Sequence, residues 1–195
     1  VDGLRRMEYR GYDSSGVCTL DDSGDGTRMI RRRAQGKLGN LVEVLAQEPA
    51  PGTIGIAHTR WATHGAPTAA NAHPHAGKAA ALVHNGIIEN FRSLRDELQA
   101  DGYSVESETD SEVVALLVSR EVERGATPED AVVGDGGAEW GKPPLVLLLN
   151  GHHVCVGHEH QARLVGTSLQ PRDNVAAIGC RFEDLGRYPI LGEPV

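Results

Sequence analysis

A short segment of the chain, from Gly55 to Gly86, concentrates side chains that can bind and orient a small polar ligand. It holds five of the nine histidines, one of the two tryptophans, and an Asn-Gly pair that follows an apolar run. Polar, ring-bearing and cationic side chains are packed densely here: Arg60, Trp61, Thr63, His64, His73, His75, His84 and Asn85. Strand-like runs flank the segment, and sites commonly lie on loops held by rigid elements. We interpret the segment as a binding site; the alternative is a solvated loop that is rich in histidine.

One carboxylate outside this segment can join it. Thr109-Asp110-Ser111-Glu112 fits a capping box, with Thr109 as the N-cap and Glu112 at the third helical position. Asp110 then occupies the first helical position, where the helix dipole stabilises its charge and leaves it available to a cationic ligand. The alternative is an ordinary acidic residue at the start of a helix.

A metal centre is the competing chemistry. Its candidate ligands in the segment are His58, His73, His75 and His84, and residues 151–160 hold four further histidines. The spacing in 151–160 matches no closed zinc pattern. The histidines of the segment alternate with Arg60 and the Asn-Gly pair, which a cation site does not need. We therefore expect no metal and no cofactor.

Apolar periodicity predicts the elements that position these residues. A helical opening ends at Gly11, and a turn rich in Asp and Gly at 21–26 joins the two strands of a hairpin. The predicted helices are 37–47, with Leu38, Leu41, Val42 and Leu45 on its apolar face, one that Asn90 caps, one from 109, and one from 127 that glycines break within two turns. The predicted strands are 17–20, 27–33, 53–59, 79–84 and 103–105, and 145–149 is a lone apolar run.

Composition excludes several function classes. The net charge of −8 argues against a surface for nucleic acid or anionic membranes, and the basic run 31–33 is interpreted as a solvated face. No apolar run approaches membrane-spanning length, and no signal-peptide pattern opens the chain. The cysteines are odd in number and widely spaced, at Cys18, Cys155 and Cys180, which predicts a reducing cytoplasm.

Five motifs stand in one order at compact spacing, and together they resemble the glutaminase domain of the glutamine–fructose-6-phosphate aminotransferase family (glucosamine-6-phosphate synthases). The motifs are E-Y-R-G-Y-D-S-S-G (8–16), H-T-R-W-A-T-H-G (58–65), N-A-H-P-H (71–75), V-H-N-G-I-I-E-N (83–90) and S-E-T-D-S-E-V (107–113). The resemblance covers about residues 1–133. Other class II glutamine amidotransferases, of the phosphoribosylpyrophosphate, asparagine and glutamate synthase types, share the general plan.

The resemblance implies an α+β fold, the αββα sandwich of N-terminal-nucleophile hydrolases, in which two stacked sheets lie between helical layers. It also implies hydrolysis of glutamine and passage of the ammonia to a sugar-phosphate domain, absent here, that binds fructose 6-phosphate and makes glucosamine 6-phosphate for hexosamine biosynthesis.

The same resemblance assigns the residues that bind glutamine. Arg60 would bind the α-carboxylate, with Thr63 and His64 beside it, because the guanidinium fork matches two carboxylate oxygens. Asp110 would bind the α-ammonium group. Trp61 would lie on the loop that closes over glutamine and excludes water.

The reacting carbonyl would meet Asn85 and Gly86. The Asn85 side-chain amide and the Gly86 backbone N–H would form the oxyanion hole, where a residue without Cβ allows close approach. His73 would support the site from behind, and Arg10 would order the strand that carries the nucleophile.

Two departures from the family pattern lead to further expectations. The family's nucleophile is an N-terminal cysteine, which by motif alignment belongs roughly a dozen residues before Val1 and whose own α-amine acts as the base. Cys18 does not replace it and is expected to pack as a small apolar residue. We therefore expect this chain, a fragment, to lack glutaminase activity; the alternatives are a non-catalytic glutamine-binding or regulatory module, or another class II amidotransferase.

The second departure is the tail. The match ends near Val133, so the fold is expected to be truncated at its N-terminus and divergent after about residue 133. Residues 134–195 are rich in Gly and Pro and weakly periodic. Our hypothesis is that this tail is frameshifted or disordered, since the helix that begins at Thr127 fails at once.

Overall fold

The computed structural model describes residues 1–21, 23–24, 27–62, 65–85, 87–127, 130–131, 145–149, 152–156 and 162–164. For residue 10 and the last three ranges the description is limited to the backbone.

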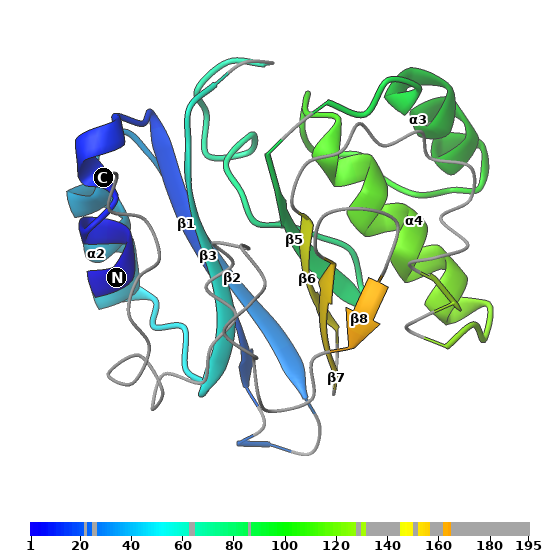
Figure 1. The fold of residues 1–195 in the computed structure, drawn as a ribbon, viewed down its shortest axis with the longest axis horizontal. Helices are drawn as coiled ribbons and strands as arrows, with labels where there is room; N and C mark the ends of the chain where they lie inside the picture. The colour runs from blue at the N-terminus through cyan, green and yellow to red at the C-terminus, as the bar shows by residue number, and fades with distance from the viewer. Residues whose placement is uncertain are drawn as a thin grey trace, which may run out of the picture.

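Two antiparallel sheets face each other and helices cover their outer faces (Figure 1). Helices α1 (Asp2–Arg5) and α2 (Leu38–Gln47) lie on the first sheet. The short 3-10 helix η1 (Glu8–Arg10) follows α1 in the chain. Helices α3 (Phe91–Ala100) and α4 (Ser111–Glu123) lie on the second sheet. The expected αββα sandwich is confirmed.

The first sheet has the order β2-β1-β3, with β1 (Ser14–Asp21) between β2 (Arg28–Gln35) and β3 (Ile54–Arg60). Nearly every residue of β1 is buried, because it is the middle strand of a layer that is itself covered on both faces. The predicted hairpin is confirmed, and both its strands run longer than the periodicity indicates. The register places Gly16 between Arg33 and His58.

The second sheet has the order β4-β5-β6-β7-β8. Its strands are β4 (His75–Ala76), β5 (Ala80–His84), β6 (Leu145–Leu149), β7 (His152–Val156) and β8 (Ala162–Leu164). The apolar run 145–149 pairs with β5, so it is a strand of this sheet. Strands β4, β7 and β8 were not predicted from the sequence. The strand predicted at 103–105 is wrong, because these residues form no strand in the described structure.

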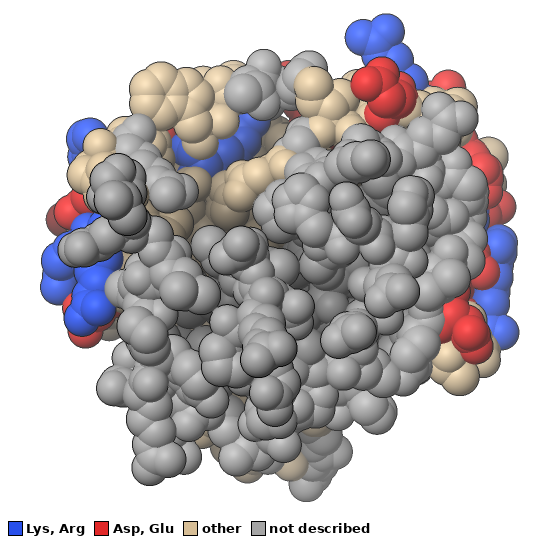
Figure 2. All heavy atoms as spheres, viewed as in Figure 1, with Lys and Arg blue, Asp and Glu red and all other residues tan. Residues whose placement is uncertain are grey.

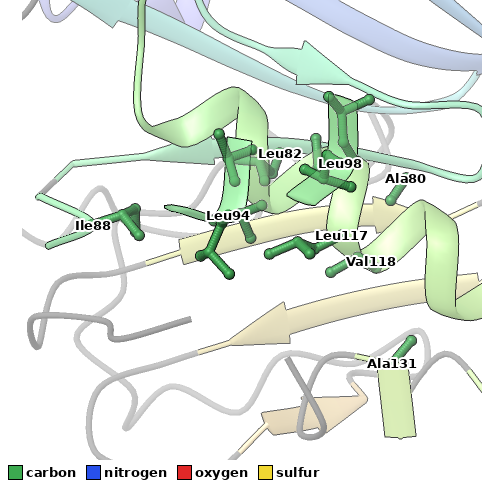
Figure 3. Packing of buried hydrophobic residues seen from close by; sticks show 12 residues of the cluster. Ala80, Leu82, Ile88, Leu94, Leu98, Leu117, Val118 and Ala131 are labelled. Carbon is green, nitrogen blue, oxygen red and sulfur yellow. The ribbon is translucent and has the colours of Figure 1, made fainter. Parts of the chain in front are cut away.

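The described residues form three apolar clusters between the layers. Alternation along β5 divides its side chains between two of them: Ala80 and Leu82 pack against α3 and α4 (Figure 3), whereas Ala81 and Val83 pack against Cys18 and its neighbours on the first sheet. The third cluster lies between α1, α2 and the first sheet and holds Leu4, Tyr12, Ala34, Leu38 and Leu41. Of the predicted face of α2, Leu45 packs against it, but Val42 is 39% exposed.

The arginines of β2 correct one prediction. A strand sends alternate side chains to opposite faces, so Arg31 and Arg33 turn toward the second sheet and Arg32 turns outward. Arg31 and Arg33 pair with Glu106, at 3.1 and 3.6 Å, and their side chains are only 21% and 13% exposed. Burial lowers the pKa of Arg33 to about 10. This run is therefore partly buried and paired with Glu106, and it is not a freely solvated face.

The described surface mixes both signs of charge, and Figure 2 shows Lys and Arg atoms beside Asp and Glu atoms along both flanks of one face. Among the helices that the structure describes, none combines the length and apolar character needed to cross a bilayer.

Candidate functional site

The last residues of β3 and β5 meet at one end of the sandwich, and the candidate site is built there. Arg60 is the last residue of β3, pairs in register with Ser14, and is 5% exposed. Asn85 directly follows β5. His58 Nε2 lies 2.9 Å from Asn85 Oδ1, so a side-chain hydrogen bond joins the two sheets at this point. Figure 2 shows a recess at the upper edge, where β3 and β5 end in Figure 1, with basic atoms in its wall.

Asp110 reaches the same end from helix α4. Its carboxylate is 7% exposed and accepts hydrogen bonds from the Ile88 backbone N–H, at 2.8 Å, and from Ser111 Oγ, at 3.2 Å. An ionised carboxylate offers about four acceptor positions, so two remain for another donor. The bond to Ile88 also anchors the backbone three residues after Asn85.

Arg60 and Asp110 are close enough to interact electrostatically. Burial lowers the pKa of Arg60, and the negative charges of Asp13 and Asp110 oppose that shift. The site therefore holds a buried cation and a buried anion that act on each other. At low local dielectric each of these charges also acts strongly on a ligand.

The start of α4 differs from the predicted capping box. Asp110, one residue later than predicted, is the N-cap, and Thr109 Oγ1 binds His75 Nε2 at 2.9 Å instead. The Glu112 carboxylate accepts from the backbone N–H groups of Glu106, at 2.9 Å, and Ser107, at 2.6 Å. The Glu112 carboxylate therefore accepts from the segment before the helix, whereas in a capping box it would accept from the Thr109 backbone N–H.

Asp13 holds the loop after β3. Its backbone N–H donates to the Arg60 carbonyl at 2.9 Å, and its carboxylate accepts from the Ala62 backbone N–H at 2.6 Å. Trp61, between these two residues, is 68% exposed. Its ring lies over Gly11, where a Cβ would stand 2.7 Å from a ring carbon and where φ is +71°. Both the close approach and the positive φ require glycine.

Asn71 and Glu108 close the other side of this loop. The Asn71 amide donates to the Ala66 carbonyl, at 2.9 Å, and to the Glu108 carboxylate, at 3.0 Å. The Glu108 backbone N–H donates back to Asn71 Oδ1 at 2.9 Å. These bonds join the loop after β3 to the segment that leads into Asp110.

Three buried imidazole rings, His58, His73 and His75, stand in successive contact behind Asn85, and we name them the histidine column. The ring centroids are 4.7 Å apart for His58 and His73 and 4.5 Å apart for His73 and His75. Burial lowers the pKa of all three, well below the ordinary value for His73 and His75. The column is therefore neutral at neutral pH. Among the described residues, no group of three or more His, Cys, Asp or Glu is arranged to hold a metal ion.

The structure brings Arg60, Asn85, Asp110 and His73 together out of the residues predicted for the site. Trp61 lies at its rim, exposed. Thr63, His64 and Gly86 lie outside the described residues, and only the backbone of Arg10, the last residue of η1, is described. Cys18 packs in the cluster between the sheets with 0% exposure, and burial raises the pKa of its thiol to about 12, as expected for an apolar packing residue.

Sequence reasoning either missed the residues that orient the site or gave them another role. These residues are Asp13, His58, Asn71, Glu108 and Glu112. All five lie inside the five motifs quoted above. Their presence in those motifs was the available signal. The contacts of Asp13 with Ala62, of His58 with Asn85 and of Asn71 with Glu108 each span 27 or more residues, so these pairings were not readable. Glu112 accepts from Glu106 and Ser107, within six residues, and the sequence pattern had assigned it to a capping box instead.

Comparison with known proteins defines the class to which this architecture belongs. Residues 46–128 match the model of a glutamine amidotransferase domain. These residues form a domain of the glutamine amidotransferase family.

Within that family, the chain is similar to glutamine–fructose-6-phosphate aminotransferases (isomerizing). The protein of Zymomonas mobilis is 62% identical over 130 residues, which are 67% of this chain and 21% of that protein. The protein of Mesorhizobium japonicum is 59% identical over 131 residues, again 67% and 21%. The protein of Gluconobacter oxydans is 50% identical over 164 residues, 84% of this chain and 26% of that protein. The chain thus spans about a fifth to a quarter of the length of these relatives.

Solved structures share the fold. The glutamine phosphoribosylpyrophosphate amidotransferase of B. subtilis matches with a TM-score of 0.60 at 22% identity, over 78% of this chain and 32% of that chain. A structure described as the allosteric regulatory enzyme of purine biosynthesis matches with a TM-score of 0.61 at 22% identity, over 80% of this chain and 33% of that chain. The fold is that of the N-terminal-nucleophile hydrolases.

Proposed function

We propose that this chain binds L-glutamine as the glutaminase part of a glutamine–fructose-6-phosphate aminotransferase. The observation that carries the proposal is the pair of buried, interacting charges, Arg60 and Asp110, beside the Asn85 amide at one end of the sandwich. A free α-amino acid carries one carboxylate and one ammonium group. It therefore needs one cation and one anion at fixed positions, and this pair supplies both.

The two charges divide the ligand between them. The Arg60 guanidinium takes the α-carboxylate, with Thr63 and His64 beside it. Asp110 takes the α-ammonium group with the acceptor positions that Ile88 and Ser111 leave open. The histidine column adds no competing charge, because its rings are neutral at neutral pH.

The side-chain amide of the bound glutamine then faces Asn85 and the Gly86 backbone N–H. These donors stabilise the oxyanion that forms when a nucleophile attacks that carbonyl. The loop of Trp61, anchored by Asp13, covers the ligand. In the whole aminotransferase of which we propose this chain to be a part, the ammonia released by glutamine hydrolysis would pass to fructose 6-phosphate, a substrate named for the relatives, and give glucosamine 6-phosphate.

Isothermal titration calorimetry of this chain with L-glutamine tests the proposal. We expect one binding event per chain, weakened about tenfold or more in Arg60→Met and in Asp110→Asn, because each loses a charge-assisted contact. The matched controls, Arg6→Met and Asp96→Asn, replace exposed side chains of the same kinds and should leave the affinity unchanged.

Three ligands sharpen the result. Glutaramate, which lacks the α-ammonium group, should bind weakly to the unmodified chain and lose nothing further in Asp110→Asn. D-glutamine should also bind weakly. Glutamine binding that survives both Arg60→Met and Asp110→Asn contradicts the proposal, and heat from zinc alone, with none from glutamine, favours a metal-binding protein.

A further inference from the structure

The structure assigns a role to His58 that neither the family match nor the proposed function contains. We propose that His58 is a positioning residue, which holds Asn85 by its amide oxygen and so directs the amide N–H groups toward the ligand. The inference rests on the proposed function for the identity of that ligand, L-glutamine. The contact between His58 and Asn85 stands without it.

The first step is the chemistry of the contact. His58 Nε2 and Asn85 Oδ1 are 2.9 Å apart. An amide oxygen only accepts hydrogen bonds, so the ring nitrogen that faces it carries the proton. His58 Nδ1 is buried and has no hydrogen-bond partner among the described residues, so a proton there would be buried without an acceptor from this part of the chain. The neutral tautomer with its proton on Nε2 satisfies both conditions.

The second step is the exposure of the two partners. His58 is 8% exposed, whereas Asn85 is an exposed residue after the end of β5. A buried side chain, His58, therefore holds the exposed Asn85 amide by a hydrogen bond to its oxygen. An asparagine amide that is free to rotate by 180° would present its oxygen or its nitrogen with similar ease. An oxygen aimed at a developing oxyanion would repel it, so the wrong rotamer is harmful and not merely neutral.

The third step is what keeps the His58 ring in place. It is the outermost ring of the histidine column, with His73 4.7 Å behind it and His75 behind that. The far end of the column is bonded to Thr109, next to Asp110, through the 2.9 Å contact of His75 Nε2. One packed row of rings thus connects the amide that faces the ligand side chain to the start of the helix that carries the anion.

The backbone around His73 is fixed as firmly. Arg33 donates to the carbonyl groups of Ala70, at 2.7 Å, and Ala72, at 3.1 Å, directly before His73. Gly16 of β1 lies so close to the His73 carbonyl that a Cβ at this position would clash with the carbonyl oxygen. The backbone that carries the His73 ring is therefore packed directly against β1.

Electrostatics favour the same protonation state. Burial lowers the pKa of His58, and the electrostatic effects of Arg60 and His84 lower it further, whereas the hydrogen bond that His58 donates to Asn85 opposes the shift. A neutral ring is also the form that a neighbouring cation, Arg60, tolerates best.

Two variants and two readouts test the role. His58→Leu removes the donor and keeps an apolar side chain in the column. His58→Gln keeps a donor near the position of Nε2. We expect the dissociation constant for L-glutamine to rise about fivefold to tenfold in His58→Leu, the loss expected for one hydrogen bond. In His58→Gln it should return to within about twofold of the unmodified chain, because the glutamine amide nitrogen replaces the imidazole donor.

L-norleucine separates positioning from general damage to the site. It keeps the α-carboxylate and the α-ammonium group and lacks the side-chain carbonyl, so it does not use Asn85. Its affinity should be equal in the unmodified chain and in His58→Leu. If both ligands weaken alike, His58 acts only in the packing of the site and the inference is overturned.

Nuclear magnetic resonance of the ligand-free chain tests the contact directly. The imidazole nitrogen shifts of His58 should report the tautomer with its proton on Nε2, and the Asn85 side-chain amide signals, assigned by their loss in Asn85→Ala, should move in His58→Leu. A proton on Nδ1 overturns the inference whatever the chain binds. If no glutamine binds at all, the proposed function fails, while this measurement still decides the contact. If glutamine binding needs Arg60 but ignores His58→Leu, the inference alone fails.

Discussion

Replacement of Glu112 by glutamine tests the most heavily bonded carboxylate of the site. Its side chain is 2% exposed and accepts three hydrogen bonds, from the backbone N–H groups of Glu106 and Ser107 and from Ser107 Oγ, at 2.9, 2.6 and 2.6 Å. These bonds form the turn that leads into Asp110. Glu112→Gln keeps the size of the side chain and removes its charge and one acceptor.

The magnitude follows from the geometry. Hydrogen bonds to a charged group contribute about 1.5–3 kcal/mol each, and neutral ones about 1 kcal/mol. The glutamine oxygen can still accept from Ser107, but its NH2 group then faces the Glu106 N–H, donor against donor. One bond is lost outright and two are weakened, so we expect the free energy of unfolding to fall by about 2–4 kcal/mol.

Urea denaturation followed by circular dichroism measures this change. With a slope of ~2 kcal/mol per molar urea, the midpoint should fall by about 1–2 M. Glu43→Gln is the matched control, because Glu43 is an exposed glutamate on α2 and its replacement should move the midpoint by under about 0.25 M. A midpoint for Glu112→Gln within the range of this control refutes the reasoning, since the three short contacts would then contribute nothing.

A second readout connects the turn to the ligand. Asp110 lies between Glu112 and the ligand position, so Glu112→Gln should also weaken L-glutamine binding at a temperature where the variant is still folded. Unchanged affinity together with a large loss of stability would mean that Asp110 is held by Ile88 and Ser111 alone.

Three further predictions concern pH and two glycines. Burial lowers the pKa of four histidines, so the unfolded chain binds more protons than the folded one below about pH 6.5. The free energy of unfolding should therefore fall as pH drops from 6.5 toward 5, by at most about 1.4 kcal/mol per pH unit for each histidine that is still neutral in the folded chain. The slope of urea midpoints with pH should be shallower in His73→Phe. A flat profile over that range would contradict the burial of these rings. Gly11→Ala should lower the free energy of unfolding by about 1–2 kcal/mol, because alanine disfavours the positive φ at this position. The added methyl group should also displace the Trp61 ring and so shift its fluorescence, measured in a Trp140→Phe background. An unchanged spectrum would show that the ring does not contact this backbone. Gly16→Ala should be more damaging, about 3 kcal/mol or more by urea denaturation, since its Cβ would meet the His73 carbonyl; a cost under about 1 kcal/mol would mean that the two layers can separate there.

The elements that local pattern controls could be predicted from the sequence. The hairpin of β1 and β2, the strands β3 and β5, and the helices α2, α3 and α4 follow from apolar periodicity and turn residues, because each uses interactions within a few residues of itself. Their lengths were less certain. β1 extends to Ser14 because its partners β2 and β3 continue to pair with it, which depends on residues far away in the chain.

Errors occurred where tertiary contacts replaced local ones. Thr109 satisfies the pattern of an N-cap, yet His75 takes its hydroxyl, and the N-cap moves to Asp110. The basic run of β2 looks solvated in sequence, yet two of its three arginines face a neighbouring layer and pair with Glu106. In both cases a partner distant in sequence competes successfully with water or with the local backbone.

The sequence by itself determined the family, the αββα architecture and the residues that carry charge or a donor amide, because their types and order are written in the five motifs. Tertiary structure alone decided how those residues are held. It places His58 against Asn85, Asp110 against Ile88, and Asp13 against the backbone on both sides of Trp61. The physical reason is that a motif specifies which groups are present, whereas a hydrogen bond depends on distance and direction to within a few tenths of an ångström. Only the stacked layers fix those two quantities.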